Sequence, residues 1–512
     1  METRDVRHPP RPRARLGLEL RGALALAGTL LKWLSLAPVF PAVLALGYGD
    51  PVLPFVVASV VGATAGLALE RVGRGAGPVV GTREGYLVVA LTWLLAAALG
   101  AIPYLLSSDP ELSRPMDAYF EAMSGFTTTG ASILTDVEAL DRSLAMWRQF
   151  TQWLGGMGII VLALAVLPRL RVGGRQLLEA ELPGPEVDEL GSRIRQTARR
   201  LWALYVALTA AQALILALLG WTGVDDRMNL FEAVAHAFTT MPTGGFSTEV
   251  RSIELYAAAT QWVIVVFMVV AGANFALTYR ALLRRQPRAA LRDEELRLYA
   301  VALVVGSALL ILVLERQDLA GSASAVRTGI FQAVSILTTT GFATADFNTW
   351  TTLALITIVG LMFVGGSAGS TGGSIKVVRH LMIGRALRRE TRLAVHPELV
   401  EPVRLNGVTV DERTIRAIIA FVLLYVGTFV AGAGVLALDT SLQGPDVRPI
   451  HVIAAAATTL GNVGPALGSA GPEGNFSEFS DVSKATMSAL MWLGRLELLP
   501  VLVLFTRSYW RR

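Results

Sequence analysis

Ten long apolar runs constrain the fold of this chain more than any other feature of its sequence. A helix needs roughly 20 predominantly apolar residues to cross a bilayer. The runs lie at residues 23–48, 52–70, 84–107, 145–169, 197–221, 258–282, 298–315, 350–382, 415–438 and 483–506. We therefore predict an all-α membrane protein that crosses the bilayer many times.

The composition excludes the soluble classes of protein. Hydrophobic residues make up 53% of the 512 residues and charged residues only 17%, whereas soluble domains average about 25% charged residues. This balance excludes a disordered chain, an ordinary cytosolic enzyme and a protein that binds nucleic acid. The chain contains no cysteine, which excludes disulfides, thiolate metal sites and cysteine nucleophiles.

Four shorter segments between the apolar runs share one pattern. Each consists of about two helical turns of small and apolar residues, followed by threonines and then by glycine. They lie at residues 118–130, 230–245, 328–341 and 449–461, and each has one span before it and one after it. This internal repetition predicts four pseudo-symmetric repeats of helix, pore helix and helix around a central ion pore.

The repeats divide the chain into six parts. An Arg-rich leader at 1–22 and a two-helix membrane unit at 23–75 precede the repeats. The first apolar run is too long for a signal peptide, so we expect it to be retained as the first of two extra transmembrane helices. The four pore repeats are expected at residues 80–172, 195–285, 295–392 and 410–512.

Arginine clusters follow alternate spans and predict the orientation in the membrane. They include Arg71, Arg74, Arg169, Arg171, Arg175, Arg280, Arg284, Arg285, Arg379, Arg385, Arg388 and Arg389. The opposite ends of the spans carry acidic residues such as Asp109, Asp225 and Asp439. By the positive-inside rule both termini are cytoplasmic, and the four Thr–Gly segments enter from the outer face.

The Thr–Gly segments are the strongest candidates for a functional site. Irregular backbone at membrane depth is tolerated only where it lines water or is buried in protein. Rings of backbone carbonyls can replace the hydration shell of a cation, and glycine permits the dihedral angles that turn carbonyls inward. The alternative is a helix-packing motif or a chance turn, but four copies at equivalent places favour a cation filter.

These motifs resemble those of the Trk/Ktr/HKT superfamily of potassium transporters, and in particular its TrkH branch. The similar stretches are SGFTTTG at 124–130, TGGFST at 243–248, TTTGF at 338–342, TTLGN at 458–462, GGSAGSTGGSIK at 365–376 and MWLGRLE at 491–497. The resemblance extends over almost the whole chain, including two spans before the repeats, and only the Arg-rich leader lies outside it.

The resemblance implies a potassium uptake protein of the bacterial inner membrane, with potassium bound as the substrate and no cofactor in this chain. The implied filter residues are Thr128, Thr129, Gly130, Thr243, Gly244, Gly245, Thr339, Thr340, Gly341, Thr459, Leu460, Gly461 and Asn462. The filter glycines are expected at Gly130, Gly341 and Gly461, with either Gly244 or Gly245 in the second repeat. In plant relatives a serine at the position of Gly130 accompanies sodium permeation, so glycine favours potassium.

A glycine-rich stretch is expected to break the run at 350–382 within the membrane, beside a cavity or ion path. The family implies that this loop, at 365–374, lies below the filter and gates it. The implied gating residues of the loop are Gly365, Gly366, Ser367, Gly369, Ser370, Thr371, Gly372 and Gly373. Close packing of helices through small residues is the alternative.

Arg495 lies near the middle of the last apolar run, where a charge is costly unless it faces protein or water. The family places an arginine here under the gating loop, where it could donate hydrogen bonds to loop carbonyls. The alternative is an ion pair with a carboxylate. Glu497 is an unsuitable partner, because residues two positions apart on a helix do not face each other.

Other polar residues in the apolar segments leave two interpretations open. Lys376 either reaches the cytoplasmic interface or takes part in gating. Glu121 and Glu232 either attract cations at the pore mouth or, as we favour, stabilise helix N-termini. Asn274 is expected to form a hydrogen bond between helices, and His236 is interpreted as a packed polar residue.

The family also implies two partners, a second copy of the chain in a homodimer and a separate cytosolic nucleotide-binding subunit, TrkA-like and of the RCK type. No dinucleotide-binding fingerprint occurs in this chain. The Arg-rich loops near 169–175, 280–292 and 379–392 are candidate docking surfaces, although topology alone explains any single arginine. The main alternative function is a sodium-permeable or sodium-coupled transporter of the same superfamily. A polytopic membrane enzyme is a distant alternative.

Overall fold

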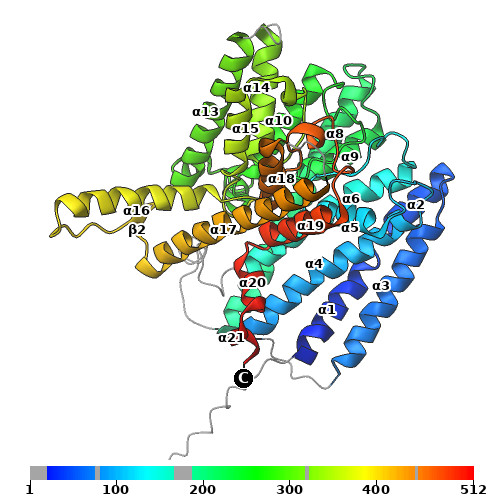
Figure 1. The fold of residues 1–512 in the computed structure, drawn as a ribbon, viewed down its shortest axis with the longest axis horizontal. Helices are drawn as coiled ribbons and strands as arrows, with labels where there is room; N and C mark the ends of the chain where they lie inside the picture. Colours follow the sequence, from blue (N-terminus) through cyan, green and yellow to red (C-terminus); the bar gives the residue numbers. More distant parts are fainter. Residues whose placement is uncertain (1–19, 75–80, 166–186, 317–321, 444–447, 512) are drawn as a thin grey trace, which may run out of the picture.

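The computed structural model describes residues 20–74, 81–165, 187–316, 322–443 and 448–511. Among these residues the only strands are β1 (Arg404–Leu405) and β2 (Val408–Thr409), which form one short antiparallel hairpin. Everything else of regular structure is helical (Figure 1). The predicted all-α class is confirmed, whereas most of the Arg-rich leader and the arginines at 169–175 lie outside the described residues.

Six segments of the described chain are long and apolar enough to cross a membrane, and two bent helix pairs raise the number to eight. The six are α1 (Leu20–Leu34) joined to α2 (Val39–Tyr48), α3 (Leu53–Val72), α4 (Thr82–Leu105), α8 (Val187–Trp221), α13 (Glu294–Arg316) and α17 (Glu412–Gln443). The predicted span at 145–169 begins as α6 (Arg142–Ala165), and its last residues are not among those described.

The outer surface of these helices is apolar. Leu46, Val304 and Leu423 expose 73%, 68% and 69% of their surface, which would be unfavourable in water but suits contact with lipid. Polar side chains gather inside instead, and Gln152 and Thr339 are completely buried. This distribution is typical of a membrane protein whose interior contains a polar path.

Within the described residues, the second helix of three repeats is broken. The loop at 365–374 lies between α15 (Thr352–Met362) and α16 (Val377–Val395), as predicted. The predicted spans at 258–282 and 483–506 are not straight, however. In the first, α10 (Ala258–Gly272) meets α11 (Phe275–Leu282) at 113°. In the second, α19 (Asp481–Arg495) meets the helical turns at 499–505 at the same angle.

Each bend coincides with a local change in the backbone. Asn274 caps α11, because its side-chain oxygen accepts hydrogen bonds from the amides of Ala276 and Leu277. Asn274 was predicted to form a hydrogen bond between helices, and its side-chain oxygen caps α11 instead. At the second bend, Glu497 and Leu498 both adopt left-handed backbone angles, with φ of 57° and 54°. Such angles end a helix and are unusual for residues other than glycine.

Four short helices lie inside the bundle at the predicted places. They are α5 (Pro115–Phe126), α9 (Leu230–Thr240), α14 (Ser322–Leu337) and α18 (Pro449–Gly461). Proline begins α5 and α18, and the Asn229 side chain caps α9 by accepting from the Glu232 amide. Proline at the first turn and Asn at the cap are both typical helix starts.

Contacts between successive repeats close the four pore helices into a ring. The second helix of each repeat packs against the pore helix of the next one: α6 on α9, α10 on α14, and α15 on α18. The last repeat returns to the first, because α19 packs against α5. Figure 1 shows α18 near the middle of the molecule and the N-terminal helices α1 and α3 at its periphery.

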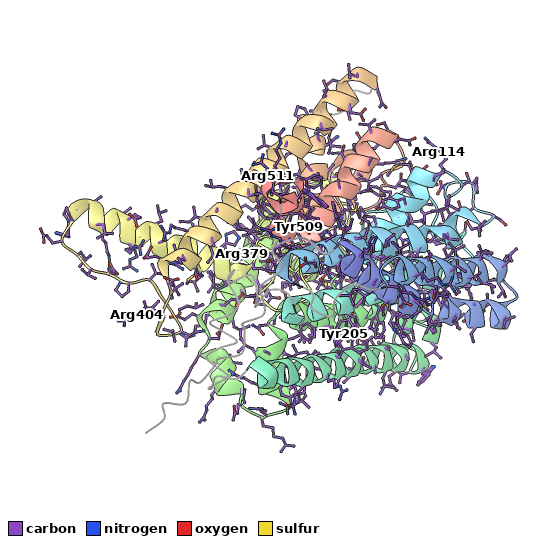
Figure 2. The ribbon with its side chains drawn as sticks, turned by 90° about the horizontal axis from the view of Figure 1, so that it is seen from below. Arg114, Tyr205, Arg379, Arg404, Tyr509 and Arg511 are labelled. Carbon is purple, nitrogen blue, oxygen red and sulfur yellow. The ribbon has the colours of Figure 1, made fainter. Side chains whose placement is uncertain are left out.

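One part of the chain projects away from this bundle. The helix α16, the β1–β2 hairpin and the start of α17 form an arm at the left of Figure 1. Figure 2 shows Arg379 where the arm joins the bundle and Arg404 on the hairpin farther out. The remaining short elements are α12 (Pro287–Leu291), η2 (Phe347–Thr349), η3 (Gly468–Ala470), α20 (Leu499–Leu502), η4 (Val503–Phe505) and α21 (Arg507–Trp510).

Candidate functional site

The chain follows the same path after each pore helix. A residue with a left-handed φ is followed two positions later by a glycine that is also left-handed. These pairs, with φ in degrees, are Thr128 (52) and Gly130 (84), Thr243 (55) and Gly245 (76), Thr339 (61) and Gly341 (85), and Asn462 (54) and Gly464 (114). Four such departures from ordinary backbone geometry, at the same spacing, define structurally equivalent positions in the four repeats.

A hydrogen bond confirms this alignment of the repeats. The amide between the two left-handed residues donates to the carbonyl oxygen five residues earlier. The four bonds are Thr129 to Ser124 (2.9 Å), Gly244 to Thr239 (2.8 Å), Thr340 to Ser335 (2.8 Å) and Val463 to Thr458 (2.9 Å). In the second repeat the equivalent glycine is therefore Gly245 rather than Gly244.

The fourth repeat differs from the predicted register. Gly461, which was expected to match Gly130 and Gly341, is the last residue of α18. The equivalent glycine is Gly464, three residues farther along the chain. The sequence at 458–461 resembles the Thr-Thr-Thr-Gly of other repeats, but Asn462 provides the left-handed residue, and asparagine adopts that conformation readily.

The four equivalent glycines form a closed ring. A Cβ atom added to any of them would overlap the carbonyl oxygen of a residue in the next repeat. The pairs are Gly130 with Gly244, Gly245 with Thr340, Gly341 with Val463, and Gly464 with Thr129. Only glycine permits both this close backbone approach and the left-handed dihedral angles. The chain segments that follow the pore helices are thus in direct contact around one axis.

Side chains on the pore helices hold the chain beyond each glycine. The position seven residues before the left-handed residue is Glu121, His236 and Gln332 in the first three repeats. Glu121 accepts from the amide of Ile133 at 3.0 Å, His236 shares a hydrogen bond with the hydroxyl of Ser247 at 3.2 Å, and Gln332 donates weakly to the carbonyl of Phe342 at 3.4 Å. In the fourth repeat this position is Ala455.

Glu121 forms a buried ion pair with Arg148 of α6. Its Oε1 atom lies 2.5 Å from the Arg148 Nε, and the two side chains are 0% and 3% exposed. Arg148 also donates to the carbonyl of Ser247 at 2.8 Å and lies 3.6 Å from the ring centre of Phe246. Glu121 therefore neither faces the pore mouth nor stabilises a helix end, and instead holds Arg148, which bonds to the second repeat.

Glu232 lies in the first turn of α9, as the helix-terminus interpretation predicts, and its carboxylate is also engaged within the protein. Its carboxylate accepts hydrogen bonds from the hydroxyls of Thr248 and Tyr256, the latter at 3.1 Å, and lies 3.6 Å from the Nδ1 of His236. His236 is fully buried and is bonded to Ser247, which agrees with its interpretation as a packed polar residue. Both glutamates thus stabilise the loops that follow the left-handed glycines.

The glycine-rich loop lies against the ends of the pore helices of three repeats. The Thr371 hydroxyl donates to the carbonyl of Met241 in the second repeat at 3.0 Å. The Gly373 amide donates to the Thr339 hydroxyl in the third repeat at 2.6 Å. A Cβ atom on Gly373 would overlap the carbonyl oxygen of Gly461 in the fourth repeat. The loop therefore lies on the side of the ring that the pore helices approach.

Arg495 contacts this loop directly. Its Nη1 donates to the carbonyl of Thr371 at 2.8 Å, and the residue is 2% exposed. Its Nε and Nη2 atoms have no hydrogen-bond partner among the described residues. Glu497 forms its ion pair with Arg379 of α16 instead. The structure therefore places Arg495 on a loop carbonyl, and at the end of α19 rather than in the middle of a straight span.

Lys376 is also part of the loop rather than of the membrane surface. Its ammonium group donates to the carbonyl of Gly372, four residues earlier, and the residue is only 7% exposed. An interaction with the cytoplasmic interface is thus excluded for this conformation. The bond closes the end of the loop immediately before α16 begins at Val377.

A cavity lies at the four equivalent glycines and is bounded by the loops that follow them. Its lining includes Gly130, Gly245, Gly341 and Gly464, together with Glu249 and Glu473 of the surrounding loops. Burial, together with the nearby carboxylate of Glu138, raises the pKa of Glu249. Within the described residues, no group of three or more His, Asp or Glu side chains is placed to hold a metal ion.

Two residues of the site were missed by the sequence analysis, and both belong to α6. Arg148 forms the buried ion pair, and Gln152, one turn later, donates to the carbonyl of Gly244 at 2.7 Å. A signal for Arg148 was present, because an ionisable residue within a predicted span is unusual and points to a buried partner. The role of Gln152 depends on Gly244, which lies 92 residues away in the sequence. The residues around Gln152 therefore give no signal of this role.

Fold and site together define a membrane protein in which four repeats enclose a ring of backbone beside a cavity. The family model for TrkH, described as a cation transport protein, matches residues 67–512. This chain belongs to the TrkH family of cation transport proteins, and the resemblance noted from its motifs is confirmed.

Individual relatives agree with this assignment. The chain is 37% identical over 433 residues to the Trk system potassium uptake protein TrkH of Escherichia coli (strain K12), covering 84% of this chain and 86% of that protein. It is 36% identical over 502 residues to the Halomonas elongata protein of the same name, covering 97% and 100%. The crystal structure of the potassium transporter TrkH from Vibrio parahaemolyticus matches with a TM-score of 0.86 and 32% identity, over 96% of this chain and 100% of that one.

Proposed function

We propose that this protein takes up potassium ions across the plasma membrane through a pore on the axis of its four pore helices. The observation that carries the proposal is the closed ring of Gly130, Gly245, Gly341 and Gly464, each lying against a carbonyl of the next repeat. Backbone carbonyls brought together around one axis can replace the hydration shell of a cation. The relatives named above as potassium uptake proteins support potassium as that cation.

The electrostatics of the site favour a cation. All four pore helices end immediately before the ring, and the C-terminal end of a helix carries a partial negative charge. The cavity at the glycines is lined by Glu249 and Glu473, which would raise the local concentration of cations. The filter would then consist of Thr128–Gly130, Thr243–Gly245, Thr339–Gly341 and, in the revised register, Asn462–Gly464.

The loop at 365–374 is proposed to gate this pore. It contacts Met241 and Thr339 below the ring, and Arg495 bonds to its Thr371 carbonyl. An arginine under a cation filter repels the permeant ion, and its hydrogen bond holds the loop in the closed position. Opening therefore requires the bond between Arg495 and Thr371 to break.

We further propose that both termini are cytoplasmic and that the protein functions as a homodimer with a separate cytosolic nucleotide-binding subunit. The arginine distribution supports the orientation. The projecting arm supports an assembly, because Leu387, Val395 and Val400 on it are 64%, 70% and 92% exposed. The molar mass of the purified protein in detergent, measured by light scattering, tests the dimer, and a monomer would contradict it.

Ion flux into liposomes tests the proposed function. Purified protein is reconstituted with either potassium or sodium as the only permeant cation, with and without the regulatory subunit. We expect potassium flux to exceed sodium flux. Equal fluxes would indicate a sodium-permeable transporter, and the absence of flux in the presence of the regulatory subunit would overturn the proposal.

A further inference from the structure

The second repeat lacks a side chain at one place where the other three repeats have one. The residue between the two left-handed positions is branched in three repeats, as Thr129, Thr340 and Val463. In the second repeat it is Gly244. Glycine leaves this backbone more conformational freedom than the branched residues leave in the other three repeats.

Gln152 of α6 occupies the vacant place. Its Nε2 donates to the carbonyl of Gly244 at 2.7 Å, and its Oε1 accepts from the amide of Phe246 at 3.1 Å. The residue is completely buried. A carbonyl can only accept and an amide N–H can only donate, so these two partners determine the orientation of the carboxamide.

The backbone of Gly244 does not itself require glycine. Its φ lies outside the left-handed region, unlike that of Gly245. A Cβ atom at Gly244 would nevertheless overlap the side-chain carboxamide of Gln152. Glycine at this position is thus explained by the presence of Gln152, and the two residues form a complementary pair.

The carbonyl that Gln152 holds belongs to the ring. Gly130 of the first repeat lies against the oxygen of Gly244, so this carbonyl is equivalent to those of Thr340, Val463 and Thr129. A carbonyl oxygen has two lone pairs and can accept from Gln152 while it faces a second partner. Arg148, one turn earlier on α6, also donates to the carbonyl of Ser247, so α6 holds this segment at both Gly244 and Ser247.

We propose that Gln152 is a positioning residue that holds the Gly244 carbonyl in the filter and thereby contributes to the selection of potassium over sodium. The inference rests on the proposed function. Without this restraint, the glycine peptide gains conformational freedom. A carbonyl that can move inward would adapt to a smaller cation, so selectivity should fall before conduction is lost.

Two substitutions of Gln152 separate its hydrogen bond from its volume. Gln152→Glu keeps the size, but an ionised carboxylate cannot donate to the Gly244 carbonyl. Gln152→Ala removes both hydrogen bonds. In the liposome assay we expect the ratio of potassium to sodium permeability to fall about fivefold in each, the equivalent of one hydrogen bond.

Gln149 offers a matched control on the same helix. It is also completely buried, but neither its oxygen nor its nitrogen has a hydrogen-bond partner among the described residues. Gln149→Ala removes a glutamine of the same size from the same helix without touching the filter. The permeability ratio of this variant should equal that of the parent.

A double substitution distinguishes positioning from a general loss of structure. Gly244→Ala alone introduces the overlap with Gln152 and should lower the permeability ratio. In the double variant Gly244→Ala with Gln152→Ala, the new methyl group has room. The permeability ratio of the double variant should therefore be higher than the ratio expected if the two single losses multiplied. A double variant in which the two losses simply multiply would overturn the inference.

The outcomes for the function and for this inference are separable. A parent protein that carries no potassium overturns the proposed function and the inference with it. A parent that selects potassium, with the same ratio in Gln152→Glu and Gln152→Ala, overturns the inference alone. Reduced selectivity in both variants, with partial recovery in the double variant, supports it.

Discussion

Asn462 is the residue at which the fourth repeat departs from the other three. Threonine occupies the equivalent left-handed position as Thr128, Thr243 and Thr339. The Asn462 side chain donates to the Thr129 hydroxyl at 3.0 Å and to the Met491 carbonyl at 2.9 Å. It thereby joins the last filter segment both to the first repeat and to α19, which shows how one residue can break the symmetry and close the ring.

The revised register makes Gly464 more sensitive to substitution than Gly461. A Cβ atom at Gly464 would lie 2.8 Å from the Thr129 oxygen at a φ of 114°, whereas at Gly461 the nearest atom is 3.2 Å away. We expect Gly464→Ala to reduce potassium flux about tenfold or more, since left-handed strain costs roughly 1–2 kcal/mol. Gly461→Ala should retain most of the flux in the same assay, and the reverse order would contradict the register.

The buried pair of Glu121 and Arg148 should contribute to stability. Removing one partner leaves an uncompensated buried charge, which typically costs about 3–5 kcal/mol. We expect Glu121→Gln to lower the midpoint of unfolding by sodium dodecyl sulfate in mixed micelles. The double substitution Glu121→Gln with Arg148→Met leaves no lone charge and should be less destabilised than Glu121→Gln. If the double variant has a lower midpoint of unfolding than Glu121→Gln, the two residues are not coupled as described.

Broken helices are the main feature at the scale of elements. The loop at 365–374 was recognisable from its glycines, because small residues in an apolar run predict a break. The bend at Glu497 and Leu498 was not, since both residues are ordinary helix formers and their left-handed angles arise from the surrounding packing. Glu497 then pairs with Arg379 at the start of the arm, so the bend links α19 to α16.

The contact of Arg495 with the loop should control basal conduction. Arg495→Ala removes the hydrogen bond to the Thr371 carbonyl and the positive charge below the filter. Without the regulatory subunit we expect potassium flux to rise about tenfold, since a hydrogen bond to a charged group contributes about 1.5–3 kcal/mol. Arg495→Lys retains the charge and should resemble the parent more closely. Unchanged flux in Arg495→Ala, with normal reconstitution, would refute the role of this bond in gating.

At the scale of the whole molecule, loops from three repeats surround the cavity at the filter. Glu138 follows the first filter segment, Glu249 the second and Glu473 the fourth. Glu249 and Glu473, from two separate repeats, line the same cavity, and Glu138 lies beside Glu249. Their combined charge, rather than any single residue, would attract cations to the pore.

The raised pKa of Glu249 predicts a dependence on external pH. Burial and the neighbouring Glu138 both disfavour its charged form, so Glu249 becomes protonated at a higher pH than an ordinary carboxyl group, which titrates near 4.3. As the external pH falls, negative charge at the cavity is lost early and flux at low ionic strength should decrease. Glu249→Gln should flatten the upper part of this profile, and an unaltered profile would contradict the prediction.

The absence of native cysteine makes the predicted orientation directly testable. Single cysteine substitutions can be labelled with a membrane-impermeant thiol reagent without any background from the chain. In intact cells we expect Glu473→Cys, at the cavity, to react and Leu387→Cys, on the arm, to react only after the cells are opened. Labelling of Leu387→Cys from outside would reverse the orientation.

The sequence by itself determined the class, the four repeats, the pore helices and the position of the glycine-rich loop at 365–374. These depend on apolar run length and on glycine and proline, whose effects on the backbone are local. Only the tertiary structure decided the register of the fourth filter segment, the bends after Gly272 and Arg495, and the partners of Glu121 and Gln152. The physical reason is clearest for the partners of Glu121 and Gln152, because those contacts join atoms that lie far apart in the sequence, such as the Gln152 amide and the Gly244 carbonyl. No window of sequence contains both members of such a contact.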